Sequence, residues 1–213
     1  MNYKVPFYPN SPDDMRCVPA VFGMILNYFT HRKYSWRELD DLTGHRSKKG
    51  TWFFPALTKL KKKGFEIEVI DTFDYKKCYE EREKYLRKYF KNPQALKFCL
   101  ERTDLFDKIE LLPEFIKTIK PKKKSPDIKD IGNFLKKGYL IAVELDMGVL
   151  NNRGSYISHL ILIIGFDKDN FIFHDPGLPP IKNRKVSKEI FEKAWSYDGE
   201  SSHNITAIKY NNQ

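Results

Sequence analysis

Cys17-Val-Pro-Ala-Val-Phe-Gly-Met-Ile-Leu-Asn-Tyr-Phe29 is an apolar stretch long enough for a helix, and the polar turn Asn10-Ser-Pro-Asp-Asp-Met-Arg16 precedes it. Pro19 falls in the first turn of this helix, where its missing N–H breaks no hydrogen bond. Cys17 therefore stands at a helix N-terminus, where unpaired backbone N–H groups and the helix dipole stabilise a thiolate. As a thiol at a helix N-terminus, Cys17 is a candidate nucleophile.

A base and a carboxylate follow much later in the chain. His159 leads the stretch His159-Leu-Ile-Leu-Ile-Ile-Gly-Phe166, and Phe171-Ile-Phe-His-Asp175 comes after a short polar turn. The two runs predict a hairpin that carries His159 and Asp175. His174 precedes Asp175 on the same strand, so we expect its side chain on the opposite face and exclude it. A lone cysteine or histidine is usually structural, but the three residues together favour a site.

The other cysteines and histidines suggest no second site. The chain has three cysteines, and their spacing fits neither a zinc pattern nor a Cys-x-x-Cys motif. We expect Cys78 and Cys99 to be buried apolar residues. Surface positions are expected for the histidines without evident partners, which are His31, His45 and His203. No metal and no organic cofactor is implied, because a thiol, an imidazole and a carboxylate suffice for acyl chemistry.

Length and composition indicate one globular domain. The chain has 213 residues, of which 41% are hydrophobic, enough to bury a substantial core. No apolar run approaches the roughly 18 residues that span a bilayer. The first residues lack a charged segment followed by an apolar one, so no secretory signal is recognised. We therefore expect a cytoplasmic protein without a membrane span.

The net charge of +10 raises the question of nucleic-acid binding. The lysines, however, come in short clusters that are spread along the chain and mixed with acidic residues, and no recognition motif accompanies them. Solubility explains the charge about as well as any partner does. Specific nucleic-acid binding is accordingly a minor hypothesis, and the sequence does not indicate an oligomeric state.

The patterns along the chain predict an α+β fold in one domain, residues 1–213. Ser35 and Glu38 form a capping box that opens a helix ending before Gly44. Charged, helical sequence at about 74–125 predicts an insertion into the main domain. Helices are expected over 17–29, 35–43, 51–63, 127–137 and 187–195, and strands over 5–8, 65–70, 139–145, 159–166, 171–175 and 205–210.

The order of these pieces resembles a known family, the papain-like cysteine peptidases related to the double-glycine (bacteriocin) leader peptidases, family thirty-nine. The resemblance covers nearly the whole chain outside the insertion. It rests on Val5-Pro-Phe-Tyr8, Cys17-Val-Pro-Ala20, Glu38-Leu-Asp-Asp-Leu-Thr-Gly44, Gly50-Thr51, Leu135-Lys-Lys-Gly138, His159 with Gly165-Phe-Asp167, His174-Asp-Pro-Gly177 and Ile190-Phe-Glu-Lys-Ala-Trp195.

The resemblance implies a papain-like fold, with an N-terminal helical half whose central helix starts at the cysteine and a C-terminal antiparallel sheet. It places Cys17 as the nucleophile, His159 as the general base and Asp175 as the residue that orients the imidazole. The expected activity is that of a cysteine peptidase, a thiol hydrolase that cleaves a peptide or amide bond through a thioester.

Two positions depart from the family pattern. Where the family has a glycine after the cysteine, this chain has Val18. Where the family has a glutamine about six residues before the cysteine, this chain has Ser11, with Asn10 beside it. Asn10 and Ser11 are therefore the candidates for the oxyanion hole. Losing one such donor costs about a hundred- to a thousandfold in turnover.

These departures keep two alternatives open beside the hydrolase. An acyltransferase or transpeptidase would pass the acyl group from the same cysteine to an amine. A catalytically inactive module would only bind peptides in the same cleft. Asp13 and Asp14 are expected to organise the turn before Cys17, or to contact a positive end of the substrate, while the lysine-rich insertion would steer acidic substrates.

Overall fold

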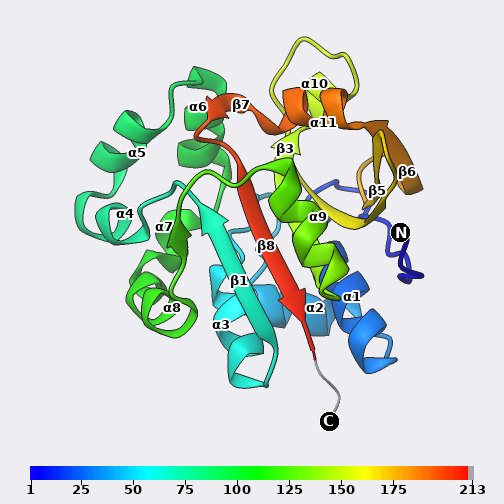
Figure 1. Ribbon diagram of the computed structural model, residues 1–213. Coiled ribbons are helices and arrows are strands. Elements are labelled where there is room, and N and C mark those ends of the chain that lie inside the picture. The colour runs from blue at the N-terminus through cyan, green and yellow to red at the C-terminus, as the bar shows by residue number, and fades with distance from the viewer. Residues whose placement is uncertain (211–213) are drawn as a thin grey trace.

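A seven-stranded sheet with helices on both faces forms the centre of the computed structural model, which describes residues 1–210 (Figure 1). The strand order is β2-β1-β8-β3-β4-β5-β6, and the neighbouring strands are antiparallel except for the short parallel pair β1 and β2. The structure confirms the α+β class. The sheet is not confined to the C-terminal half, because β1 comes from the N-terminal half and pairs with β8.

The elements follow one another in chain order. They are α1 (Cys17–Thr30), α2 (Trp36–Thr43), α3 (Phe54–Lys62), β1 (Glu66–Asp71), α4 (Tyr75–Glu81), α5 (Glu83–Tyr89), α6 (Pro93–Arg102), α7 (Leu105–Lys108), the 3-10 turn η1 (Ile109–Leu111), α8 (Leu112–Ile119), β2 (Lys122–Lys123), α9 (Ile128–Lys136), β3 (Leu140–Asp146), α10 (Met147–Leu150), β4 (Ser158–Phe166), β5 (Asn170–Asp175), β6 (Ile181–Ser187), α11 (Lys188–Trp195), β7 (Tyr197–Glu200) and β8 (Asn204–Lys209).

Two apolar cores lie on opposite faces of the sheet. On one face α1, α3 and α8 cover the sheet, and the buried residues of α1 from Val18 to Leu26 belong to this core. On the other face α9 and α11 pack against the strands, with Phe191 and Trp195 fully buried. Apolar side chains alternate between the two cores along β4: Leu160 and Leu162 belong to the core under α1, whereas Ile161 and Ile163 belong to the core under α9 and α11. The first core holds the N-terminus of α1 against the sheet.

The segment 5–8 was predicted as a strand, and this prediction was wrong. The N-terminus pairs with β4 only at an isolated bridge between Asn2 and Gly165, and the chain then runs without a ladder. Pro6 has no N–H to donate. The carbonyl of Val5 bonds instead to the His174 ring at 3.0 Å.

Helices α4 to α8 occupy most of the range that we interpret as an insertion, residues 74–125 (Figure 1). The first helical segment is broken at Arg82, whose φ of 51° ends α4 and starts α5. α8 packs on α3 and β1, so the helices join the first core. A buried ion pair ties them to the segment before α3: Lys108 Nζ lies 2.6 Å from Asp104 Oδ2 and donates to the carbonyl of Trp52 at 2.8 Å.

Candidate active site

Cys17 is the first residue of α1 and is partly exposed. No side chain caps this helix, so its first N–H groups are left without intrahelical partners. The preceding residue, Arg16, is held by Asp40 on α2, with Nε 3.1 Å from Oδ1. The next residue, Val18, is buried in the first core. Cys17 is therefore the first residue of a helix that packs on the sheet, and the structure confirms the helix predicted from residue 17.

His159 and Asp175 meet on neighbouring strands. The ring nitrogen Nε2 of His159, on β4, lies 2.9 Å from Oδ1 of Asp175, on β5, and both side chains are buried. Asp175 also accepts from the backbone N–H of Gly177 at 3.0 Å. Because Nε2 faces Asp175, the other ring nitrogen, Nδ1, is left for another partner, and Cys17 lies near enough to raise the pKa of this imidazole.

A fourth residue, Arg184 on β6, completes the chain of contacts. Its Nη1 donates to Oδ2 of Asp175 at 2.8 Å, and its Nη2 donates to Oδ1 of Asn151 at 2.7 Å. Asp175 thus has one oxygen on the imidazole and the other on the guanidinium. Sequence reasoning missed Arg184, because its strand has no apolar alternation and the contact is set by the register that pairs Phe173 with Arg184.

The electrostatics favour a protonated imidazole. Burial would lower the pKa of His159, but the hydrogen bond to Asp175, the interaction with Cys17 and the charges of both raise it to about 10. Burial would raise the pKa of Asp175, yet the contacts from His159, Gly177 and Arg184 hold it below its ordinary value. An imidazolium between a carboxylate and a sulfur is the arrangement that supports a thiolate.

Asn10 and Ser11, the candidates for the oxyanion hole, make hydrogen bonds within the turn before α1. The carbonyl Oδ1 of Asn10 accepts from the backbone N–H of Ser11 at 2.8 Å and of Arg16 at 2.7 Å, and its Nδ2 donates to Asp14 at 2.7 Å. The hydroxyl of Ser11 donates to Asp13 at 2.5 Å. Both side chains are buried and organise the turn. Burial raises the pKa of Asp14, and the charge of His159, close enough to act on it, opposes that effect.

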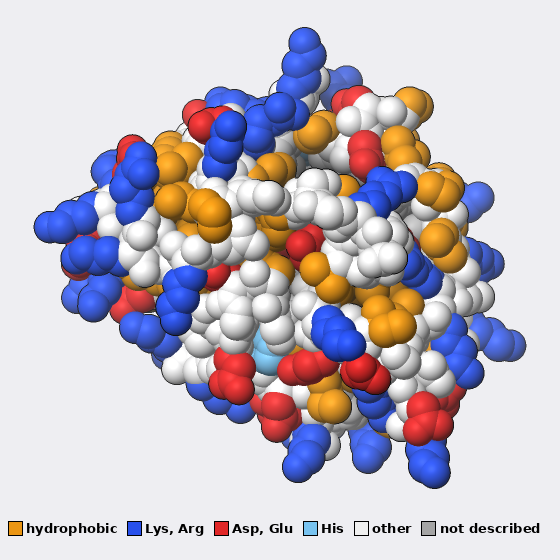
Figure 2. Space-filling view, turned by 90° about the horizontal axis from the view of Figure 1, so that it is seen from above, with side chains coloured by type: hydrophobic (Ala, Val, Ile, Leu, Met, Phe, Trp, Pro, Cys, Tyr) orange, Lys and Arg blue, Asp and Glu red, His pale blue; other side chains and the backbone are white. Residues whose placement is uncertain are grey.

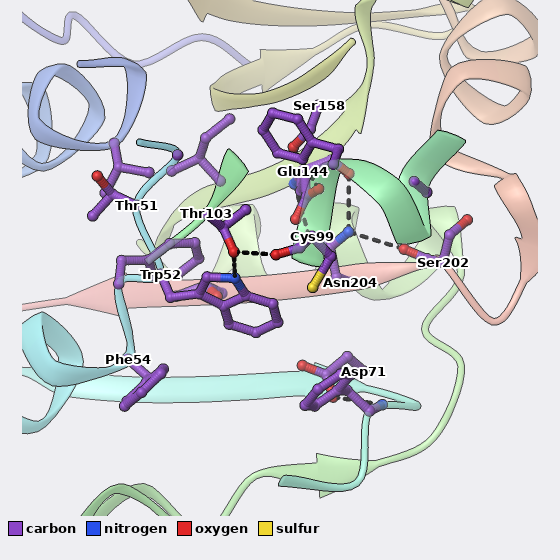
Figure 3. A pocket seen from close by; sticks show the side chains of 18 of the residues that line it. Thr51, Trp52, Phe54, Asp71, Cys99, Thr103, Glu144, Ser158, Ser202 and Asn204 are labelled. Atoms are coloured by element: carbon purple, nitrogen blue, oxygen red, sulfur yellow. Dashed lines mark hydrogen bonds between the residues drawn. The ribbon is translucent and has the colours of Figure 1, made fainter. Parts of the chain in front are cut away.

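A cavity of about 150 Å³ opens beside the cysteine, and Cys17 and Val18 line one part of it. Figure 3 shows its other walls, which include Trp52, Glu144 and Asp71. The indole N–H of Trp52 donates to Thr103 at 3.1 Å. The candidate nucleophile is therefore next to a space large enough for part of a bound molecule.

Comparison with known proteins identifies the family. The model of the Peptidase_C39 like family matches residues 3–203. The chain belongs to this family. Among curated proteins, none matches. No helix in residues 1–210 is long and apolar enough to cross a membrane.

Two solved structures have the same fold as this C39-like chain. One is the peptidase domain of Streptococcus ComA, a bi-functional ABC transporter involved in a quorum sensing pathway, with 18% identity over 96% of this chain and 98% of that chain and a TM-score of 0.52. The other, from Bacillus anthracis, is described as a C39-like peptidase, with 16% identity over 98% and 96% and a TM-score of 0.50. At these identities the likeness establishes the fold.

Among the remaining cysteines and histidines of this C39-like chain, His31 is exposed, as predicted, and His45 is partly exposed. Cys78 and Cys99 are buried, as predicted. His203 was predicted at the surface, and this was wrong: only 4% of it is exposed, and its ring stacks on Trp195 at 4.2 Å between centroids. His174 is buried on the Val5 side, as expected for the face opposite Asp175. Within residues 1–210, no group of three or more His, Cys, Asp or Glu side chains is placed to hold a metal ion.

Proposed function

We propose that this protein is a cysteine peptidase that cleaves a peptide or amide bond through a thioester on Cys17. The observation that carries the proposal is the buried hydrogen bond between the His159 ring and Asp175, in an imidazole whose pKa Asp175 and Cys17 together raise to about 10. Membership in the Peptidase_C39 like family supports the same reaction class.

In the proposed reaction the Cys17 thiolate attacks the carbonyl carbon, and the carbonyl oxygen takes the negative charge. His159 then gives its proton to the leaving amine as the C–N bond breaks, which leaves a thioester on Cys17. A water molecule next gives a proton to His159 and attacks the thioester, and the acid product leaves as the thiolate re-forms. Asp175 keeps the ring oriented and stabilises the imidazolium through both proton transfers.

Asn10 is the better proposed side-chain donor to the oxyanion. An amide nitrogen carries two hydrogens, and Asp14 takes one from Nδ2 of Asn10. The single hydroxyl hydrogen of Ser11 is already given to Asp13. The backbone N–H of Cys17, in the first turn of α1, is the proposed second donor. Asn10→Ala should therefore lower turnover more than Ser11→Ala does.

The experiment uses the full chain and a mixture of peptides of natural sequence. New peptide termini are identified by mass spectrometry after incubation with the wild type, Cys17→Ala and His159→Ala. We expect new termini with the wild type only. A wild type that produces none, together with a Cys17 no more reactive towards iodoacetamide than Cys78 or Cys99, would overturn the proposal and leave a peptide-binding module.

Adding a simple amine to the same reaction separates hydrolysis from acyl transfer. A hydrolase gives free carboxyl termini whether or not the amine is present. Products that carry the amine at their new C-termini would instead assign the acyltransferase or transpeptidase alternative to the same thioester. The ratio of the two products measures how well water competes for the thioester.

A further inference from the structure

The cavity beside Cys17 has an unusual lining for this chain. Eleven of its 28 lining residues are Phe, Tyr or Trp, two are acidic, and none of the described lining residues is Lys or Arg. The chain as a whole carries 38 Lys and Arg residues and a net charge of +10. Figure 2 shows the face seen from above, where lysine and arginine side chains gather mostly along the outer edge. The cavity is thus an electronegative, aromatic space in a basic protein.

One carboxyl group, Glu144, faces this space from β3. Its Oε1 accepts from Ser158 Oγ at 2.7 Å and from Tyr156 OH at 3.3 Å. The residue is surrounded by protein but keeps some accessible surface, and the cavity is the space that it lines. Burial raises the pKa of Glu144, since no cation compensates its charge.

A second carboxyl group, Asp71 at the end of β1, lines the same cavity. In the view of Figure 3 the Trp52 ring lies between Glu144 and Asp71. Asp71 accepts from Tyr75 OH at 2.7 Å and from the backbone N–H of Phe73 at 3.0 Å. Burial raises its pKa to about 6. Two carboxyl groups with aromatic walls are the surroundings that bind a cation, through charge and through the ring faces.

We propose that this cavity is the specificity pocket of the candidate peptidase and that it takes a lysine or arginine side chain next to the scissile bond, with Glu144 as the residue that selects the charge. The proposal rests on the proposed function, because Cys17 lines the pocket. A volume of about 150 Å³ is far above the roughly 10–15 Å³ that one water needs. The pocket would therefore prefer a basic side chain, whereas the lysine-rich surface would attract acidic substrates at long range.

The first test compares peptides that differ at one position near the cleaved bond, chosen from the mixture experiment. Lysine, norleucine and glutamate are placed there, since norleucine keeps the apolar stem of lysine without the charge. We expect kcat/KM for lysine to exceed that for norleucine by about tenfold or more. Equal or better cleavage of the norleucine peptide would overturn the pocket assignment and leave the peptidase proposal intact.

Glu144→Gln tests the selecting residue, because it keeps the shape and removes the charge. We expect the ratio of kcat/KM between the lysine and norleucine peptides to fall to near one. Glu101→Gln is the matched control: it removes the same charge from the exposed side of α6, whose Cys99 lines the cavity, and should leave the ratio unchanged. An unchanged ratio in Glu144→Gln would overturn its role.

The second test does not need catalysis. Binding of Nα-acetyl-lysine methylamide and of its norleucine analogue to Cys17→Ala is measured by calorimetry. Tighter binding of the lysine compound, lost in the Cys17→Ala/Glu144→Gln variant, would support the pocket even if no peptide is cleaved. The failure of both compounds to bind, or equal binding of the two, would overturn the pocket whatever the outcome for the peptidase.

Discussion

Replacing Asp175 with asparagine tests the proposed catalytic contacts most directly. The substitution keeps the size of the side chain and removes the charge that lies 2.9 Å from Nε2 of His159. The pKa of this buried imidazole is about 10 against an ordinary 6.5, and at about 1.4 kcal/mol for each tenfold change in proton affinity the difference amounts to about 5 kcal/mol. The hydrogen bond to Asp175 is the largest of the contributions that raise it, ahead of the interaction with Cys17.

If Asp175 supplies half of that stabilisation, the variant destabilises the imidazolium by about 2.5 kcal/mol, roughly fifty- to a hundredfold. The assay is the rate of Cys17 alkylation by iodoacetamide as a function of pH, followed by mass spectrometry of the modified peptide. The variant should lose its fast alkylation at a lower pH than the wild type, because its imidazole gives up its proton earlier as the pH rises, and the two curves should converge at low pH, where both imidazoles are protonated. Cys78 and Cys99 are internal controls, because burial raises the pKa of each thiol to about 12.

The same charge change on an exposed carboxylate, Glu189→Gln on α11, provides the matched control. A wild-type alkylation profile in Asp175→Asn, or an equal change in Glu189→Gln, would show that the charge of Asp175 does not control the reactivity of Cys17. Stability gives a second readout. Because the folded-state pKa of His159 is raised, its contribution to the free energy of unfolding is fully present below pH 6.5 and is lost as the pH rises through about 10. That loss should be much smaller in Asp175→Asn.

Two further predictions concern ion pairs. Arg184→Met removes the 2.8 Å contact to Asp175, so the free energy that orients Asp175 should fall by about 1.5–3 kcal/mol. Alkylation of Cys17 should then slow about tenfold or more. An unchanged alkylation rate would show that Asp175 is oriented without Arg184. Lys108→Met leaves Asp104 buried without its cation, and urea denaturation should show a loss of about 3–5 kcal/mol in the free energy of unfolding. Lys49 is partly exposed and pairs with Asp107 at 2.9 Å, so Lys49→Met should cost under about 1 kcal/mol. Similar losses in the two lysine variants would contradict the buried-pair argument.

The local parts of this fold were predictable because short-range patterns decide them. α1 follows from its apolar run and its polar turn, and the structure ends it at Thr30. The capping box of Ser35 and Glu38 is present with both of its hydrogen bonds. The strands that carry His159 and Asp175 form the expected antiparallel pair. The order of these pieces along the chain was enough to indicate the family.

The parts that sequence reasoning missed depend on contacts between distant segments. β6, Ile181–Ser187, is a largely exposed edge strand rich in lysine and arginine, so it lacks the alternation by which strands are recognised. Arg184 reaches Asp175 only because β5 and β6 pair in one register. The cavity likewise joins residues from both halves of the chain, and no local pattern marks Glu144 as one of its walls.

The register of the sheet places the proposed catalytic residue His159 and the proposed specificity residue Glu144 on different faces. Leu145 pairs with His159 and Glu144 pairs with Leu160, so alternation places His159 and Glu144 on opposite faces of the sheet. Cys17, the first residue of α1, acts on the pKa of the imidazole and also lines the cavity. A change at Glu144 should therefore alter which peptide is cleaved without altering the alkylation profile of Cys17. A variant at that position that shifts both would show that the two faces are coupled.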